Sequence, residues 1–498
     1  MIKAVNKDIL AIIFIAVLAF SLRAPAINKA LMTDEGKIYT AVNGSYGMIP
    51  EFLIKTEAHP PLYYYFSKVW RGVSDARWWM RFPNIIFGSL TALVLYLAAR
   101  ELFDTRIARL AGFITALSPN LVFISETLRP YSMATFLMSL TILFFIRYFM
   151  RGGLPYLLLY AVSAALSAYT YYFNILVIIS LNLFLFIKLR SIKFARALGL
   201  FAASAAAGAL FLPWVPYMQR QMAEALSDSG SYGQLFIAKK FGAYIGNIHV
   251  GAMMRGILGA FQIDNAIFTN IRLHAHLDKA LLLVLAAGVT IIFGYLIWKS
   301  RKRLLESESA RGATALIITI VFAPLLLAAI LKISMGFEIL QRYMGPLAVF
   351  SSIIMAGFIL SFNKKIYVNS LVVILAGFFV MRIFCIWGYN DKDHTKLRDY
   401  ITNDGRSKVV ISAEPNIFKG APGSKGLKII EADKGYVSIK EALKGEESFY
   451  WVEFNTPIAV IRGSSGGGVI RKGLEGDYRV ADTVRLDDVV SVYLYRKR

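Results

Sequence analysis

The chain has 498 residues, of which 57% are hydrophobic and only 17% charged. Soluble domains carry about 25% charged residues, so this composition excludes an ordinary soluble enzyme and indicates a membrane protein. The net charge of +23 does not predict nucleic-acid binding, because much of the basic charge sits in short loops between apolar runs. The single cysteine, Cys385, excludes an intramolecular disulfide and a metal cluster built on cysteines.

The first apolar run covers residues 9–22 and follows Lys3 and Lys7. A basic start before an apolar run is also typical of a secretory signal peptide. Arg23, directly after the run, and Pro25, inside the only cleavage-like sequence, favour an uncleaved span. With either interpretation, the segment that follows faces outside.

Ten further apolar runs follow, and we expect each to form a membrane-spanning helix, although the runs at 107–117 and 175–187 are somewhat short. They cover residues 85–99, 107–117, 131–149, 157–169, 175–187, 197–212, 280–298, 313–331, 344–360 and 367–386. We therefore expect a polytopic α-helical membrane protein with about eleven transmembrane helices.

Basic residues concentrate in every second connection between these runs. The basic positions are Arg100, Arg106, Arg109, Arg147, Arg151, Lys188, Arg190, Lys193, Arg196, Lys299, Arg301, Lys302, Arg303, Lys364 and Lys365. Short basic loops stay in the cytoplasm, so this pattern predicts a cytoplasmic N-terminus. It also predicts that the long loops 23–84 and 213–279 lie outside.

The last part of the chain, residues 388–498, is polar and rich in turn residues. Strand-like runs occupy 408–412, 427–430, 449–452, 459–461 and 489–493, with helical stretches at 395–402 and 438–443. Together they predict a small extracytoplasmic α/β domain after a transmembrane domain of residues 1–387.

Two adjacent acids, Asp34 and Glu35, open the first outer loop. A carboxylate at this position can act as a general base toward an attacking hydroxyl group. Alternatively, Thr33 or Asp34 caps the helix that follows. The acidic pair alone does not decide between these interpretations.

The same outer loop continues with Glu57-Ala58-His59-Pro60-Pro61. The prolines delay helix formation until Leu62, which holds His59 at the top of the next element. A histidine there can bind a phosphate. The alternative is an interfacial histidine beside an aromatic belt.

Several arginines lie in or near outer connections, where the positive-inside rule does not explain them. The planar guanidinium offers paired donors that suit a phosphate. The alternatives are lipid headgroup contacts, or ion pairs with Glu126 and Glu338. With the acids and His59, they predict an outer site for a lipid phosphate. These arginines are Arg77, Arg81, Arg129 and Arg342.

In this order, the motifs resemble the GT-C-type glycosyltransferases, and most of all the branch of protein mannosyltransferases and bacterial aminoarabinose transferases. The resemblance covers most of residues 1–360. It rests on Thr33-Asp34-Glu35, His59-Pro60-Pro61-Leu62-Tyr63-Tyr64, Arg81-Phe82-Pro83-Asn84, and the segments 99–103, 117–119, 129–131 and 341–343.

The resemblance implies inverting transfer of a sugar from a polyprenyl phosphate to an acceptor hydroxyl on a lipid, glycan or protein. The reaction would take place at the outer face of the cell (inner) membrane. Asp34 matches the catalytic base and Glu35 its neighbouring acid, while Glu126 is the candidate second acid. No cofactor is required, although a divalent metal stays open because some relatives in the wider superfamily use one. The residues expected around the donor phosphate are His59, Arg81, Arg129, Tyr131, Arg342 and Tyr343.

Two other functions stay open. A transporter or flippase of lipid-linked glycans would show ionisable residues or broken helices near the middle of the membrane. Here the notable charges cluster at one face. A non-enzymatic envelope assembly protein would leave Asp34 and His59 without a role.

Overall fold

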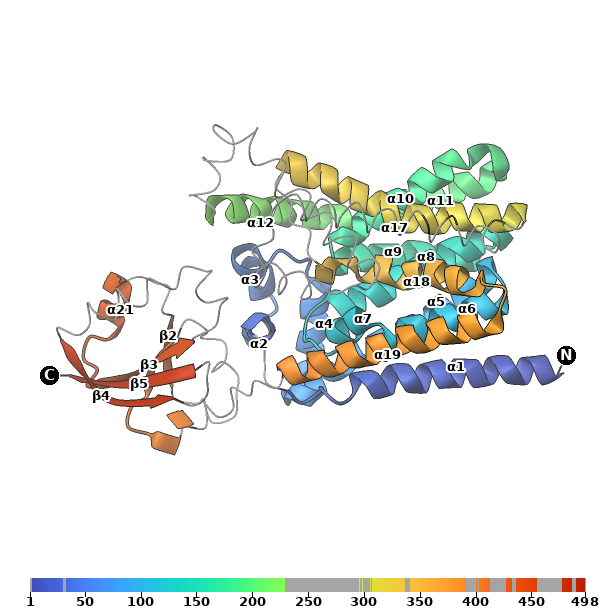
Figure 1. Ribbon diagram of the computed structural model, residues 1–498. Coiled ribbons are helices and arrows are strands. Elements are labelled where there is room, and N and C mark those ends of the chain that lie inside the picture. The colour runs from blue at the N-terminus through green and yellow to red at the C-terminus, as the bar shows by residue number, and fades with distance from the viewer. Residues whose placement is uncertain are drawn as a thin grey trace. The chain divides into compact units, whose positions relative to one another are not determined.

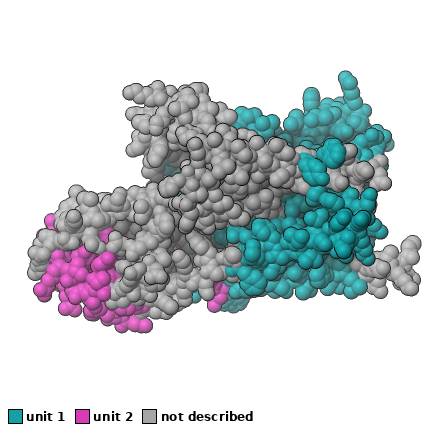
Figure 2. Space-filling view, in the orientation of Figure 1, with its two compact units in different colours: residues 1–27, 45–387 teal, residues 28–44, 388–498 magenta. Residues whose placement is uncertain are grey.

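The chain forms two compact units, coloured separately in Figure 2. Unit 1 comprises residues 1–27 and 45–387, and unit 2 comprises residues 28–44 and 388–498. The computed structural model describes the backbone of residues 2–29, 33–228, 295, 298, 305, 307–335, 341–390, 400–401, 403–412, 427–431, 436–454, 477–485 and 490–497. The side chains of Asp34, Arg342 and Cys385 lie outside the described residues.

Unit 1 is helical, and several of its long helices run side by side in Figure 1. The apolar helices are α1 (Ile2–Arg23), α5 (Arg77–Leu102), α6 (Thr105–Leu117), α8 (Tyr131–Arg151), α9 (Leu154–Thr170), α10 (Phe173–Ile187), α11 (Phe194–Phe211), α17 (Glu308–Met335), α18 (Gly345–Leu360) and α19 (Lys365–Asn390). Each lies over an apolar run that the sequence shows. The remaining run, 280–298, is outside the described residues except for Tyr295 and Trp298, so the count of eleven stays a prediction.

Among the described residues, five helices are long and apolar enough to cross a membrane. A sixth span results if α6 and α7 (Pro119–Ser125), which meet at a bend of 54°, count as one. The bend has a local cause: Pro119 cannot donate a backbone hydrogen bond, and the Ser118 hydroxyl caps the new helix at Leu121 N. These helices make the chain an integral membrane protein.

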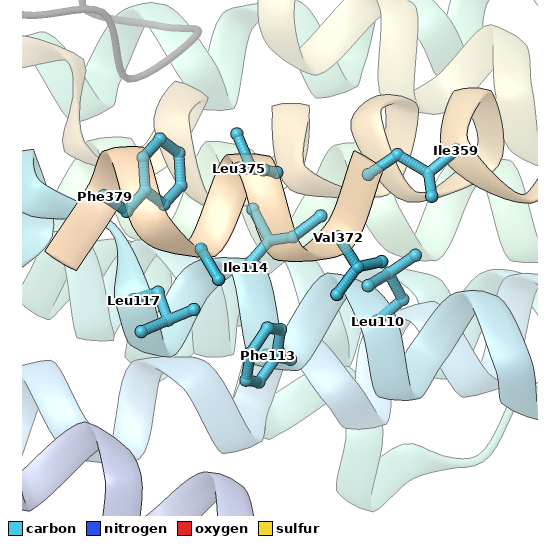
Figure 3. A pocket seen from close by; sticks show the side chains of 9 residues that line it. Leu110, Phe113, Ile114, Leu117, Ile359, Val372, Leu375 and Phe379 are labelled. Carbon is cyan, nitrogen blue, oxygen red and sulfur yellow. The ribbon is translucent and has the colours of Figure 1, made fainter. Parts of the chain in front are cut away.

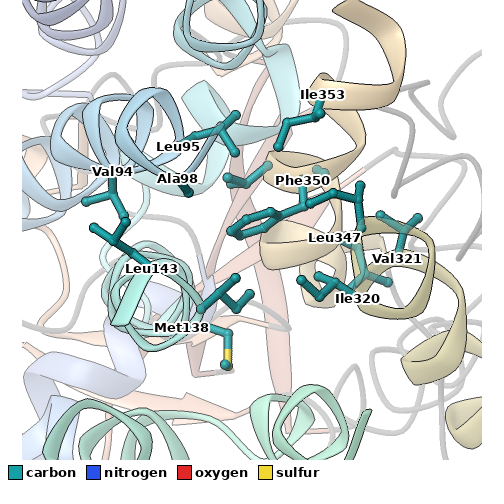
Figure 4. Close-up of a cluster of buried hydrophobic side chains, with 14 of the residues drawn as sticks. Val94, Leu95, Ala98, Met138, Leu143, Ile320, Val321, Leu347, Phe350 and Ile353 are labelled. Atoms are coloured by element: carbon teal, nitrogen blue, oxygen red, sulfur yellow. The ribbon is translucent and has the colours of Figure 1, made fainter. Parts of the chain in front are cut away.

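The core of unit 1 lies where α5, α8, α17 and α18 meet. Figure 4 shows Leu95, Met138 and Phe350 pointing into this core from three of these helices. Lipid tails are as apolar as leucine, so close packing rather than water exclusion holds such helices together. A narrow seam between α6, α18 and α19, seen in Figure 3, is lined only by apolar side chains, including Phe113 and Phe379.

Short helices precede and connect the spans. They are α3 (Met48–Thr56), α4 (Leu62–Arg71), η1 (Leu189–Ser191), η2 (Leu212–Trp214), α12 (Val215–Asp228) and η3 (Gln341–Met344). The turn from α4 to α5 is fixed by two stacked indoles, Trp70 and Trp79, whose ring centroids lie 4.4 Å apart. Each indole N–H donates to the backbone carbonyl of the other residue, at 2.8 and 3.1 Å. The start of α5 is thereby set relative to α4.

Unit 2 contains α2 (Thr33–Asn43), α21 (Tyr436–Ala442) and a five-stranded mixed sheet. The strand order is β2-β1-β3-β5-β4, with β1 parallel to both β2 and β3, and β5 antiparallel to both β3 and β4. The strands are β1 (Val409–Ser412), β2 (Lys428–Glu431), β3 (Ser448–Phe454), β4 (Tyr478–Arg485) and β5 (Val490–Lys497).

Alternating side chains cover the two faces of this sheet, as the period of two requires. Val409 and Phe449 pack on one face with Ile439 of α21, whereas Val410 and Tyr450 pack on the other with Ile401. The strand-like runs at 408–412, 427–430, 449–452 and 489–493 overlap β1, β2, β3 and β5. Strand β4 was not predicted from the sequence. The run at 459–461 and most of the helical stretch at 395–402 lie outside the described residues.

Candidate functional site

Two loops of unit 1 bring the candidate phosphate-binding residues together. The first joins α3 to α4 and carries Glu57 and His59, and the second joins α7 to α8 and carries Arg129. The first loop stays extended because α3 ends at Glu57 and Pro60-Pro61 postpone α4 until Leu62. All three side chains are at least nine-tenths buried.

The Arg129 guanidinium makes a paired contact with the Glu57 carboxylate. Nη1 donates to Oε1 at 2.8 Å and Nη2 donates to Oε2 at 2.7 Å. Nη2 also lies 2.9 Å from His59 Nε2. A guanidinium only donates, so His59 accepts at Nε2 and is neutral in this arrangement. The 3.6 Å separation between His59 Nε2 and Glu57 Oε2 is too long for a hydrogen bond. Glu57 and His59 therefore share one cation.

Burial and the Glu57 carboxylate shift the pKa values of Tyr64 and Arg129. Burial raises the pKa of the Tyr64 hydroxyl well above its usual value, and the nearby Glu57 carboxylate raises it further. Burial works against the charged form of Arg129, but the hydrogen bonds and charge of Glu57 help to raise the pKa of Arg129 above its usual value. The site thus pairs the Arg129 guanidinium with the Glu57 carboxylate beside the Tyr64 phenol.

Three tyrosines form an aromatic wall beside His59. Its ring centroid lies 5.7 Å from that of Tyr131 and 5.4 Å from that of Tyr171. The ring of Tyr343, in η3, lies 5.4 Å from Tyr171 and 6.4 Å from Tyr131. Arg129 lies over the Tyr131 ring at 5.9 Å, within the reach of a cation–π contact. Residues far apart in the sequence thus come together beside His59, and one of them, Tyr131, contacts Arg129.

Asn84 holds the Arg129 loop against α5. Its side-chain amide donates to the carbonyl oxygens of Thr127 and Arg129 at 2.5 and 3.1 Å, and to the Tyr63 hydroxyl at 3.0 Å. The backbone carbonyl oxygen of Asn84 accepts a hydrogen bond from the Ser132 hydroxyl at 2.7 Å. The Arg-Phe-Pro-Asn motif therefore contributes through its asparagine, which positions the backbone of the second loop.

Gln221 of α12 holds the first loop in the same way. Its amide donates to the carbonyl oxygens of Leu53, Glu57 and His59 at 3.2, 3.1 and 3.0 Å. Its side-chain oxygen accepts from the Tyr172 hydroxyl. This buried amide joins α12 to a loop more than 160 residues earlier in the chain, so the Glu57–His59 backbone is fixed at several points.

A second buried cation, Arg23, lies at the end of α1. Its guanidinium donates to the carbonyl oxygens of Ala19 and Ala116 at 2.8 and 3.0 Å, and to the Ser125 hydroxyl at 3.2 Å. This binds the C-terminal ends of α1 and α6 to the last turn of α7. Gly88 of α5 makes room for the contact, because a Cβ there would lie 2.0 Å from Ser125 Oγ and 3.0 Å from Arg23 Nε.

The structure brings only some of the predicted site residues together. Four of them lie near one another: His59, Arg129, Tyr131 and Tyr343. Arg81 is fully buried and donates to the carbonyl of Ile27 at 3.2 Å.

Glu126 is also fully buried, and its charge acts on Arg23. Glu35 is buried on α2, which belongs to unit 2. Three further residues of the site, Glu57, Tyr171 and Gln221, were not predicted from the sequence. Glu57 stands in the quoted proline motif, whereas Tyr171 and Gln221 give no local signal.

The described residues contain no group of three or more His, Cys, Asp or Glu side chains that could hold a metal ion. The Asp34 side chain is not among them. The cation at the described site is the arginine.

Comparisons with known proteins agree with this architecture. Residues 58–217 match the family model for "Dolichyl-phosphate-mannose-protein mannosyltransferase", a stretch that holds His59, Asn84 and Arg129. No curated protein sequence matches the chain.

Solved structures of low sequence identity share the fold. ArnT from Cupriavidus metallidurans, bound to undecaprenyl phosphate, is 13% identical with a TM-score of 0.56, and the similarity covers 98% of each chain. The oligosaccharyltransferase AglB from Archaeoglobus fulgidus, in complex with an inhibitory peptide and a dolichol-phosphate, is 12% identical with a TM-score of 0.53, over 89% of this chain and 69% of that one. The same oligosaccharyltransferase in complex with Zn and sulfate is 13% identical, with a TM-score of 0.55 over 94% and 71%. Residues 58–217 thus match a mannosyltransferase family model, and the chain shares its fold with ArnT and AglB.

Proposed function

We propose that the chain is an inverting glycosyltransferase that moves a sugar from a polyprenyl phosphate to an acceptor hydroxyl at the outer membrane face. The observation that carries the proposal is the buried Arg129, which contacts Glu57 and His59 and lies over the Tyr131 ring. It lies in the part of the chain that matches the mannosyltransferase family model. Neighbours of the same fold bind dolichol-phosphate or undecaprenyl phosphate, which supports this donor class.

The chemistry explains why the site needs a buried guanidinium. The acceptor oxygen attacks the anomeric carbon, the bond from that carbon to the phosphate oxygen breaks, and polyprenyl phosphate leaves. The donor phosphodiester carries one negative charge, whereas the monoester product carries about −1.5 to −2 at pH 7. Negative charge therefore grows on the phosphate during the reaction. A pre-positioned arginine in a water-poor site stabilises the phosphate more strongly as this negative charge grows.

The acceptor proton needs a base, and we assign this role to Asp34 on the strength of its motif. Glu35 would orient the acceptor or the loop. His59, Arg81, Arg342, Tyr131 and Tyr343 would contribute to holding the donor phosphate, and Glu126 would be the second acid. We assign no fixed role to a metal ion. The acceptor is a lipid, glycan or protein hydroxyl.

The direct test is a transfer assay with the purified full-length chain in detergent. Undecaprenyl-phosphate-linked sugars would be supplied with candidate acceptors, and release of undecaprenyl phosphate would be measured. We expect Asp34→Asn to lower kcat by about 10²- to 10⁴-fold, the usual contribution of a general base. The matched control is Asp75→Asn, at an exposed carboxylate that pairs with Arg71, and it should keep wild-type turnover.

Two outcomes would contradict the proposal. Full turnover in the Asp34→Asn variant would show that the base is elsewhere. Wild-type protein that releases no undecaprenyl phosphate from any donor, yet moves a labelled lipid-linked glycan across a vesicle membrane, would identify a flippase.

A further inference from the structure

We propose that Glu57 is a displaceable counter-ligand of Arg129, which gives up the guanidinium to the donor phosphate and returns to it to expel the polyprenyl phosphate product. This inference rests on the proposed function and adds a means of product release at the same site.

The first support is that Glu57 uses the atoms that a phosphate would need. Both terminal nitrogens of Arg129 donate to Glu57, one to each carboxylate oxygen, at 2.8 and 2.7 Å. Paired N–H donors are also how arginine holds a phosphate. A phosphate and the Glu57 carboxylate cannot both bind the edge of the guanidinium formed by Nη1 and Nη2. A phosphate that binds there has to displace Glu57.

The second support is that the exchange needs only a side-chain rotation. The backbone carbonyls of Glu57 and His59 are held by Gln221, and the Glu57 backbone N–H donates to the carbonyl of Leu53 at 3.1 Å. The Arg129 backbone is held by Asn84. The loop therefore stays in place while the carboxylate moves, and the movement is limited to the side-chain torsions of one residue.

The third support is electrostatic. A buried arginine without a partner is costly, so whatever leaves Arg129 has to be replaced by another anion. Exchange of a carboxylate for a phosphate keeps the guanidinium paired throughout. The product phosphate is more negative than the donor phosphate, so a site that binds the growing charge well also releases its product slowly. A carboxylate tethered in the same loop offsets this by competing for Arg129.

The test is a binding measurement with undecaprenyl phosphate on the full-length chain in detergent. Without its charge, Glu57→Gln competes less for Arg129, so we expect undecaprenyl phosphate to bind about tenfold tighter, the scale of one charged hydrogen bond. Product inhibition in the transfer assay should become stronger, and kcat should fall if release limits turnover. Undecaprenol, which has no phosphate, should bind wild type and variant alike.

The matched control is Glu51→Gln. Glu51 makes the same paired contact with an arginine, Arg220, at 3.0 and 3.1 Å, but both side chains are exposed. This variant should bind undecaprenyl phosphate as wild type does. Glu57→Asp provides a second variant that keeps the charge but shortens the side chain, so its paired grip on Arg129 is lost. It should also bind tighter than wild type, by a smaller factor.

The possible results separate this inference from the proposed function. If wild type binds undecaprenyl phosphate and turns over, but neither Glu57 variant binds it more tightly, then only the displacement is wrong. If wild type neither binds undecaprenyl phosphate nor turns over, the proposed function fails and the inference fails with it. If inorganic phosphate binds wild type as tightly as undecaprenyl phosphate does, the site serves free phosphate and both are overturned.

Discussion

At the residue scale, Arg406 of unit 2 joins two acids from distant parts of the chain. Its guanidinium donates to both oxygens of Asp404 at 2.7 and 2.8 Å, and to Asp482 at 2.7 Å. The irregular register of β4 between Val480 and Asp482 accompanies this contact. Asp404 also accepts a hydrogen bond from the Tyr450 hydroxyl. The cluster connects the segment before β1 to the strand at the far edge of the sheet.

This cluster predicts a loss of stability in acid. The hydrogen bond from Arg406 lowers the pKa of Asp482. Burial opposes ionisation of Asp404, but Arg406 and Tyr450 outweigh it and lower the pKa of Asp404 as well. Groups with lowered pKa values stabilise the fold above their unfolded pKa of about 3.9, and this contribution is lost as the pH falls through the folded value.

The measurement is the melting temperature of the full chain between about pH 5 and about pH 3. Asp482→Asn should show a smaller drop in acid than wild type. The control is Asp477→Asn, at an exposed pair with Lys440, which should follow wild type. An Asp482→Asn curve that parallels wild type throughout would contradict the role of the cluster.

At the element scale, α12 carries Gln221, which holds the loop with Glu57 and His59 in place. Gln221→Leu removes the one amide that donates to Leu53, Glu57 and His59. With this loop loosened, we expect the KM for the donor to rise about tenfold, since each lost hydrogen bond costs about 1 kcal/mol. The melting temperature should fall as well, because three carbonyl oxygens lose a buried donor.

The control for this prediction lies on the same helix. Gln219 is exposed, so Gln219→Leu should keep the wild-type KM. Equal KM values for the two variants would mean that Gln221 does not position the loop.

The strands and helices differ in how well the sequence predicts them. Strands β1 and β3 alternate apolar residues such as Val409, Ile411 and Phe449 on a buried face, and this pattern is visible in the sequence. Strand β4 carries three charged residues, Arg479, Asp482 and Arg485, and gives no such pattern, because an edge strand buries less. The α6–α7 bend is also local, since Ser118-Pro119 marks it.

At the scale of the whole molecule, the basic loops predict the orientation in the membrane. We expect the turn at Asp75, whose side chain is 74% exposed, to face outside, and the loops at Arg190 and Lys364 to face the cytoplasm. With Cys385 replaced by serine, single cysteines at 75, 190 and 364 would be treated with a membrane-impermeant maleimide in intact cells. Only position 75 should react before the membrane is permeabilised.

The reverse labelling pattern would overturn the orientation and place the Arg129 site on the cytoplasmic side. A cysteine at 75 that reacts only after permeabilisation is the most direct such result. Labelling of all three positions in intact cells would instead show that the cells leak.

The candidate site could be predicted only in part, and the reason is distance along the chain. Motif resemblance identified His59, Arg129 and Tyr343 as parts of one site, and the structure brings them together. Glu57 lies in the same motif as His59, but the motif does not reveal that its carboxylate pairs with Arg129. Gln221 acts over 162 residues on His59, and no local pattern encodes such a contact.

Gly88 shows how space alone can restrict the evolution of this protein. Any larger residue there would collide with the contact between Arg23 and Ser125. Even the addition of one methyl group at position 88 would push apart the ends of three helices. The absence of a Cβ at Gly88 therefore restricts which substitutions this protein can accept.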